Sequence, residues 1–72
     1  MDNTTIKIGE TLKKIRISKN LSQEDFSELT QVHRTYISPL ERGLKNPSII
    51  TLKKITNNLN ISLVDFFNLA DL

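Results

Sequence analysis

The feature that most constrains this chain is the stretch of residues 22–43, which reads SQEDFSELTQVHRTYISPLERG. Ser22, followed three residues later by Asp25, is a helix-capping pair, and Gly43 stands where a helix commonly stops. The residues between them predict two short helices, the second over about residues 33–42, with residues 31–32 in a tight turn. Two short helices joined in this way favour an all-helical domain.

The remainder of the chain has apolar residues at helical spacing and lacks the long alternation that strands show. A first helix is predicted over about residues 5–19, a fourth after Ser48, and a short fifth after Ser62, whose pairing with Asp65 repeats the capping pattern. The predicted inward residues are Ile8, Leu12 and Ile15 in the first helix, Phe26 and Leu29 in the second, and Ile49, Leu52, Ile55 and Leu59 in the fourth. We therefore expect a compact all-α fold of five helices.

Length and composition indicate a single domain over residues 1–72, because a chain this short supplies one small core. Cysteine is absent, which excludes disulfides and thiolate metal sites, and the lone histidine, His33, is not expected to bind metal. No apolar run reaches the roughly 20 residues of a membrane span, and the N-terminus lacks a secretory layout. We expect no cofactor, no small-molecule ligand, no membrane contact, and a cytoplasmic protein on the nucleoid.

Charge is unevenly distributed along a chain whose net charge is only +2. Between residues 31 and 58 a single acidic side chain, Glu41, accompanies five basic ones, which are Arg34, Arg42, Lys45, Lys53 and Lys54. A basic middle suits a surface that faces phosphates. Ordinary solvated surface explains the charge pattern equally well, so charge alone does not decide the function.

The helix predicted over residues 33–42 divides into two faces when its residues are placed at intervals of about 100°. Tyr36, Ile37 and Leu40 form an apolar arc, and the opposite arc contains Arg34, Thr35, Ser38, Pro39 and Arg42. Arginine, threonine and serine hydrogen-bond to base edges in a DNA major groove, which admits one α-helix. Because the N-terminal residues of such a helix lie deepest, we predict base contacts by Arg34 and Thr35, then Ser38. Arg42, at the far end, is predicted to meet phosphate.

Four parts of the sequence carry a family resemblance: LKKIR with KNLSQEDFSELT, then HRTYISPLERG, NPSIITLKKI and ISLVDFF. In this order and spacing they resemble the phage-repressor and Cro-type (XRE-like) helix-turn-helix family over about residues 8–67. The resemblance implies a five-helix fold whose second and third helices bind double-stranded DNA. RTYIS followed by ERG and NPS is most similar to the controller proteins of restriction–modification systems, which are homodimers that regulate transcription from palindromic operators.

The resemblance also implies roles for individual residues. The base-facing positions are Arg34, Thr35, Ser38 and Pro39, and the phosphate-contacting positions are Gln23, Arg42, Lys45 and Asn46. Tyr36 is a further candidate for phosphate, although its angle in the helix favours the edge of the core. Arg16 and Glu41 match a structural ion pair between the first and third helices, which accounts for an acid so near the expected DNA face.

The predicted fifth helix holds more apolar side chains than one small core accepts. We expect residues 61–72 to provide the contact between two copies of the chain, through Val64, Phe66, Phe67 and Leu69. A two-fold dimer would read two half-sites about 34 Å apart. Apolar residues that are merely exposed are the alternative explanation.

Two residues depart from the family pattern. Gln31 stands in the turn where glycine is common, and a left-handed backbone there costs a non-glycine residue about 1 kcal/mol. Pro39 removes an amide donor from the helix interior and crowds the carbonyl of Thr35, at a cost of about 3 kcal/mol. We expect the helix to bend at Pro39, and this position to touch a thymine methyl or no base.

These observations favour a sequence-specific DNA-binding transcriptional regulator. The residues do not separate a restriction–modification controller from a phage or plasmid repressor or an antitoxin. A protein-interaction module that keeps the fold without reading DNA is the alternative from another class, and Pro39 is its main support. We do not expect an enzyme, because the sequence suggests no converging catalytic residues and has no glycine-rich phosphate loop.

Overall fold

The computed structural model describes residues 3–72 and contains five helices: α1 (Thr4–Ser18), α2 (Gln23–Thr30), α3 (Arg34–Glu41), α4 (Ile49–Asn58) and α5 (Leu63–Leu69). No strand occurs in this range. The expected five-helix, all-α fold is therefore confirmed, and the predicted bounds of α1 and α3 differ from the observed ones by one residue at each end. None of the helices within residues 3–72 is both long and apolar enough to cross a bilayer.

Serine side chains begin three of these helices. Ser22 accepts a hydrogen bond from the Asp25 amide at 3.0 Å, and the Asp25 carboxylate accepts one from the Ser22 amide at 3.3 Å. Ser48 accepts a bond from the amide three residues further on at 3.1 Å. Ser62 accepts a bond from the Asp65 amide at 3.0 Å. This bond is the serine part of the capping pair predicted for Ser62 and Asp65. These bonds satisfy amides that the first turn of a helix leaves without partners.

Left-handed residues end the first four helices. Asn20, Gln31, Gly43 and Asn60 follow α1, α2, α3 and α4 with φ between 57° and 75°. Gly43 occupies the expected stop position, and a Cβ there would lie 3.0 Å from the Cα of Ile6. Asparagine and glycine tolerate this backbone conformation well, but glutamine does not. The strain anticipated at Gln31 is therefore present in the turn.

Every helix contributes to one apolar core, which contains Ile8, Leu12, Phe26, Val32, Ile37, Leu40, Leu52, Ile55, Leu59 and Phe66. Leu29 and Ile49 were expected among these residues but are exposed. In α2 the inward position one turn after Phe26 belongs to Thr30, whose hydroxyl donates to the Phe26 carbonyl at 2.7 Å and is thereby buried with a partner. Ile49 is the first residue of α4, one turn before Leu52, where the buried stripe begins.

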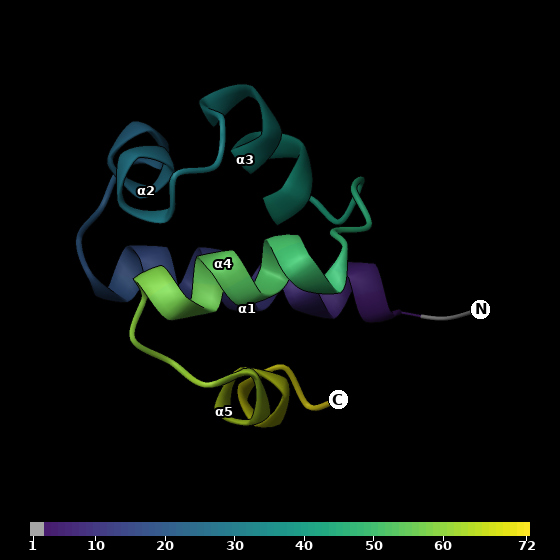
Figure 1. Ribbon diagram of the computed structural model, residues 1–72. Helices are drawn as coiled ribbons and strands as arrows, with labels where there is room; N and C mark the ends of the chain where they lie inside the picture. The colour runs from purple at the N-terminus through teal and green to yellow at the C-terminus, as the bar shows by residue number, and fades with distance from the viewer. Residues whose placement is uncertain (1–2) are drawn as a thin grey trace.

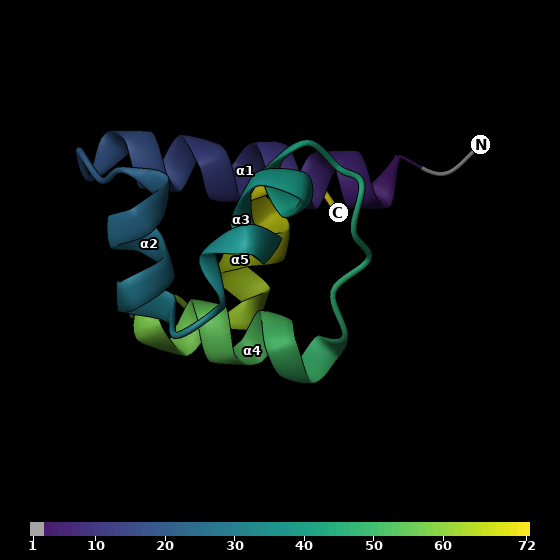
Figure 2. The same ribbon diagram turned by 90° about the horizontal axis from the view of Figure 1, so that it is seen from above.

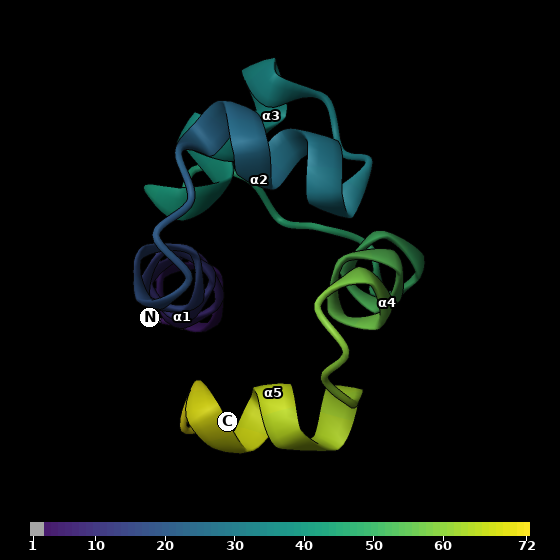
Figure 3. The same cartoon turned by 90° about the vertical axis from the view of Figure 1, so that its left-hand side faces the viewer.

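The helices surround this core on four sides. α2 and α3 lie together on one side, α1 and α4 form the middle, and α5 covers the opposite side (Figure 1). Seen from above, α3 lies over the space between α1 and α4 (Figure 2), and Figure 3 shows it on the same side of these two helices as α2. Gly9 permits the close approach of α1 to α3, because a Cβ there would lie only 2.3 Å from the carbonyl oxygen of Leu40. α3 is thus held by α1 and α2, and its remaining side faces outward.

Candidate nucleic-acid interface

α3 turns one face into the core and the other towards the surface. Ile37 and Leu40 are fully buried. The residues predicted to face DNA bases all lie outside: Arg34 and Thr35 are exposed, and Ser38 and Pro39 are partly exposed. The two sides of α3 therefore follow the angular division expected from the sequence.

The turn between α2 and α3 is built around Val32, which is buried. The hydroxyl of Ser27 donates to the Val32 carbonyl at 2.5 Å and so ties the turn to α2. Gln31 reverses the chain through its left-handed conformation, with φ 59° and ψ 31°. A packed unit, rather than a loose loop, therefore presents the outward face of α3.

His33 is the N-cap of α3, although histidine is not one of the usual capping residues. Its ring nitrogen Nδ1 accepts a hydrogen bond from the Thr35 amide at 3.2 Å. The same nitrogen lies 2.7 Å from Oγ1 of Thr35. The imidazole thus supplies the acceptor that the residue type did not suggest, and it contacts a predicted base-reading side chain.

Pro39 lies inside α3, which continues through it to Glu41. Because α3 has eight residues, Pro39 stands in its last turn, where it removes the one backbone bond that its own amide would have made. The Pro39 carbonyl accepts a bond from the Leu44 amide at 2.9 Å, which closes the end of the helix around Gly43. Pro39 therefore does not end the helix, and the bend at this residue stays a prediction.

Arg34, the first residue of α3, lies beside Glu24 of α2. Nη1 of Arg34 is 3.9 Å from Oε1 of Glu24, and the side chains are 67% and 69% exposed. An ion pair this exposed contributes at most about 1 kcal/mol. Arg34 can therefore exchange Glu24 for a stronger partner such as a base edge or a phosphate.

Arg16 and Glu41 form the structural ion pair expected between α1 and α3, and the pair is two-pronged. Nε and Nη2 of Arg16 donate to the two carboxylate oxygens of Glu41 at 2.7 and 3.1 Å. Nη1 of Arg16 donates to the Leu21 carbonyl at 2.8 Å. The Arg16 and Glu41 side chains are only 13% and 3% exposed. This pair fastens the C-terminal end of α3 to α1.

Gln23, expected at a phosphate, belongs to the same network. Its side-chain amide Nε2 donates to Oε1 of Glu41 at 3.1 Å, and the residue is half-buried. The buried carboxylate thus has three donors, two from Arg16 and one from Gln23. The sequence pattern did not predict the bond between Gln23 and Glu41, because the two residues are 18 positions apart and belong to different helices.

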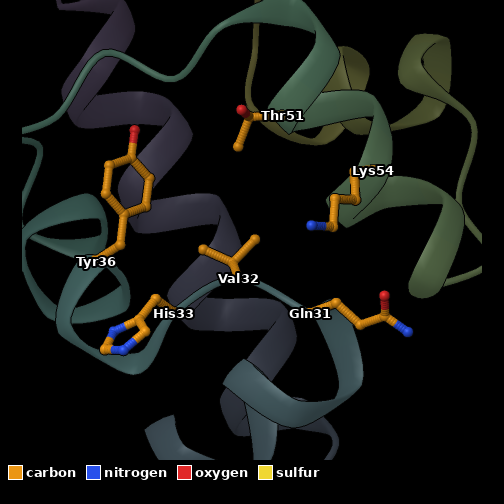
Figure 4. A pocket seen from close by; sticks show the side chains of 6 residues that line it. All are labelled: Gln31, Val32, His33, Tyr36, Thr51 and Lys54. Carbon is orange, nitrogen blue, oxygen red and sulfur yellow. The ribbon is translucent and has the colours of Figure 1, made fainter.

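Tyr36 is half-buried beside an open cavity of about 390 Å³ between the turn, α3 and α4. Figure 4 shows Val32 at the floor of this cavity and the Lys54 ammonium pointing towards its centre from the side opposite Tyr36. Gln31, His33 and Thr51 complete the lining. The sequence placed Lys54 only among the basic residues between positions 31 and 58. Its position in the lining of the same cavity as Tyr36 makes it a further candidate for a phosphate contact.

The other residues expected at phosphates follow the end of α3. Arg42 is exposed at the C-cap, where its Nε donates to the Ser38 carbonyl at 3.4 Å. Lys45 and Asn46 are exposed in the connection to α4. Basic and polar side chains therefore lie beyond one end of α3, and Arg34 lies at the other.

The four residues expected between two copies of the chain differ in exposure. Val64 and Leu69 are 68% and 63% exposed, and Phe67 is half-buried against the core. Phe66 is fully buried, with its ring centroid 6.0 Å from that of Phe67. The expectation that Phe66 contacts a second copy is wrong, because the core of one protomer already covers its whole side chain.

Comparison with known proteins agrees with this geometry. Residues 12–66 match the model of a helix-turn-helix family, HTH_3. The control protein C.MunI from a Mycoplasma species is 41% identical over 69 residues, which cover 94% of this chain and 93% of that protein. The control protein C.BamHI from Bacillus amyloliquefaciens is 36% identical over 74 residues, with 97% and 91% covered.

Solved structures of controller proteins have the same fold. The restriction–modification controller protein C.Esp1396I, as a tetramer in complex with its natural 35 base-pair operator, matches with a TM-score of 0.87 at 35% identity, covering 99% of this chain and 93% of that one. The controller protein C.AhdI from Aeromonas hydrophila matches with a TM-score of 0.82 at 32% identity, covering 92% and 100%. The chain belongs to the helix-turn-helix family of DNA-binding transcriptional regulators, in the group that includes restriction–modification controller proteins.

Proposed function

We propose that this chain is a sequence-specific transcriptional regulator that binds a palindromic operator as a homodimer, in the manner of a restriction–modification controller. The observation that carries the proposal is the outward face of α3, which exposes Arg34 and Thr35 at the N-terminal end of a firmly packed helix. The similarity to control proteins along nearly the whole chain supports the controller assignment. C.Esp1396I, which was solved on its operator, supports DNA as the partner.

Base recognition follows from the order of side chains along α3. The helix enters a major groove with its N-terminal residues deepest. Arg34 leaves Glu24 and donates two hydrogen bonds to O6 and N7 of a guanine. Thr35 and Ser38 present hydroxyls from the same outward face, and Pro39 offers its ring to a thymine methyl or touches no base.

Phosphate contacts fix the position of α3 without reading sequence. Arg42, Lys45 and Asn46 supply them beyond the C-terminal end of the helix, and Tyr36 with Lys54 supplies them beside the cavity. Gln23 is the first residue of α2, and the free amides at this N-terminus attract a phosphate. Its side chain donates a hydrogen bond to Glu41.

Two copies associate through α5. Val64 and Leu69 are exposed apolar side chains on this helix, and Phe67 is half-exposed. Two-fold symmetry then directs the two α3 helices to half-sites about 34 Å apart. The dimer works in the cytoplasm on the nucleoid, and regulation by occupancy of DNA requires neither a catalytic step nor a cofactor.

Binding to two DNA duplexes tests the proposal. Fluorescence anisotropy should show binding to a duplex from just upstream of the protein's own gene. Because binding through six or more phosphate contacts is sensitive to salt, raising the salt concentration from about 50 to 200 mM should lower the affinity by about 10³-fold or more. Arg34→Ala should lose about 1–3 kcal/mol on this duplex and much less on random DNA. Lys13→Ala, which removes an exposed charge from α1, is the matched control and should retain the specificity ratio.

Three results would change the assignment. If Arg34→Ala lost the same binding affinity on both duplexes, Arg34 would be a phosphate contact and not a residue that reads a base. Absence of binding to either duplex at low salt would favour the protein-interaction module, for which the proline on the outward face of α3 is the supporting observation. Footprints at promoters other than those of restriction–modification genes would favour a phage or plasmid repressor or an antitoxin.

A further inference from the structure

Two groups of Thr35 converge on one ring nitrogen at the start of α3. The backbone amide of Thr35 donates to Nδ1 of His33 at 3.2 Å, and Oγ1 of Thr35 lies 2.7 Å from the same atom. An amide N–H can only donate, so Nδ1 is the acceptor in this contact. The Thr35 hydroxyl can therefore bond to Nδ1 only as a donor.

This bond uses the one hydrogen that the Thr35 hydroxyl possesses. What remains for an approaching base is the oxygen as an acceptor and the side-chain methyl. The bond also selects the orientation of both groups, because a β-branched side chain in a helix has few χ1 rotamers. His33 thus controls both the polarity and the direction of a side chain that faces outward at the deep end of α3.

Base edges in the major groove respond differently to an acceptor. The amino groups of adenine N6 and cytosine N4 are donors and can bond to the Thr35 oxygen. Guanine offers only the acceptors N7 and O6, which need a donor that the engaged hydroxyl lacks. We infer that His33 is a specificity-determining positioning residue that makes Thr35 accept from adenine or cytosine and discriminate against guanine. This inference rests on the proposed DNA-binding function.

Substitution of His33 separates this role from simple helix capping. His33→Gly removes the acceptor while leaving a residue that is tolerated at an N-cap. His33→Asn keeps an uncharged acceptor in the side chain and is the matched control. Thr35→Val removes the hydroxyl but keeps the branched shape, so it identifies the base position that Thr35 reads.

The experiment measures the affinity of each variant for operator duplexes that carry each of the four base pairs, in turn, at every half-site position. At the position where Thr35→Val loses discrimination, the wild type should prefer adenine or cytosine to guanine. His33→Gly frees the hydroxyl to donate, so the discrimination against guanine should narrow by about three- to tenfold. His33→Asn should retain the wild-type preference, and His33→Gly should have no effect on preference in a Thr35→Val background.

Four outcomes would overturn the inference. Equal weakening by His33→Gly for all four base pairs would show that His33 only caps the helix. Wild-type preference for guanine at the Thr35 position, or no change of discrimination at any position in Thr35→Val, would refute the acceptor role while the proposed function stands. A wild type that binds no DNA would overturn the proposed function and this inference together.

Discussion

Glu41→Gln tests whether the buried ion pair behind α3 holds the domain together. The substitution keeps the shape of the side chain but removes its charge and replaces one acceptor oxygen by a donor NH₂ group. One of the two bonds from Arg16 is then lost, and a guanidinium that is 13% exposed remains without a counter-charge. Removing one partner of a buried pair costs about 3–5 kcal/mol, because the other charge stays desolvated.

That loss is a large share of the stability available to this chain. A domain of 72 residues has a free energy of unfolding of about 4–11 kcal/mol. At about 4–8 °C per kcal/mol, Glu41→Gln should lower the melting temperature by at least about 12 °C. Urea and thermal unfolding followed by far-UV circular dichroism measure both quantities.

Glu24→Gln is the matched control, because it makes the same chemical change at an exposed pair. Glu24 lies 3.9 Å from Arg34 and is 69% exposed, so its substitution should change the free energy of unfolding by less than about 1 kcal/mol. The double variant Arg16→Met with Glu41→Leu should recover much of the stability lost in Glu41→Gln, since an apolar replacement leaves no unpaired charge. A loss below about 1 kcal/mol in Glu41→Gln would refute the reasoning, because the pair would then behave as a surface contact.

Three further predictions concern other parts of the fold. Gly9→Ala should destabilise the domain by about 1–3 kcal/mol in urea unfolding, because the new Cβ would lie 2.3 Å from the Leu40 carbonyl oxygen. In an uncrowded helix the same substitution stabilises by about 1 kcal/mol, and that result would disprove the close approach. Gln31→Gly should raise the free energy of unfolding by up to about 1 kcal/mol, since φ is 59° there, and a loss in the same assay would contradict the assignment of strain. Leu69→Glu should weaken dimer formation measured by sedimentation equilibrium, and an unchanged dissociation constant would exclude this exposed side chain from the interface.

The helices of this fold were predictable because their ends are encoded locally. Ser22 with Asp25, Ser48 and Ser62 supply acceptors for first-turn amides, and Gly43 supplies a residue for the left-handed stop. Each signal acts within a few residues of the chain. These signals located the start of α2, α4 and α5 and the end of α3, and apolar spacing placed the bounds of α1 to within one residue.

Burial was less predictable because it depends on how the helices pack. Leu29 is apolar and lies near the inward face of α2, yet Thr30 takes the buried position since its hydroxyl finds a partner within its own helix. Phe66 was expected at a surface, but α5 turns it into the core and leaves Val64 outside. Periodicity defines a face of a helix, whereas the neighbouring helices decide which of its residues are covered.

The candidate interface shows the same division. The outward side of α3 followed from angular spacing, because a single helix determines it. The role of Gln23 at Glu41 and the cavity beside Lys54 required elements distant in sequence to come together. Gly9 carried a readable signal, since an isolated glycine inside a helical pattern often marks a close packing contact. The imidazole cap of His33 had no such signal, because histidine is uncommon at that position.

Selection of binding sites from a library of random DNA duplexes tests the central claim most directly. The full chain should enrich a two-fold symmetric motif whose half-sites lie about 34 Å apart, or one helical turn. Arg34→Ala should enrich the same motif with one base pair of each half-site relaxed. Enrichment of no motif by the wild type, or of a motif that Arg34→Ala leaves unchanged, would contradict the account of α3 as the helix that reads DNA.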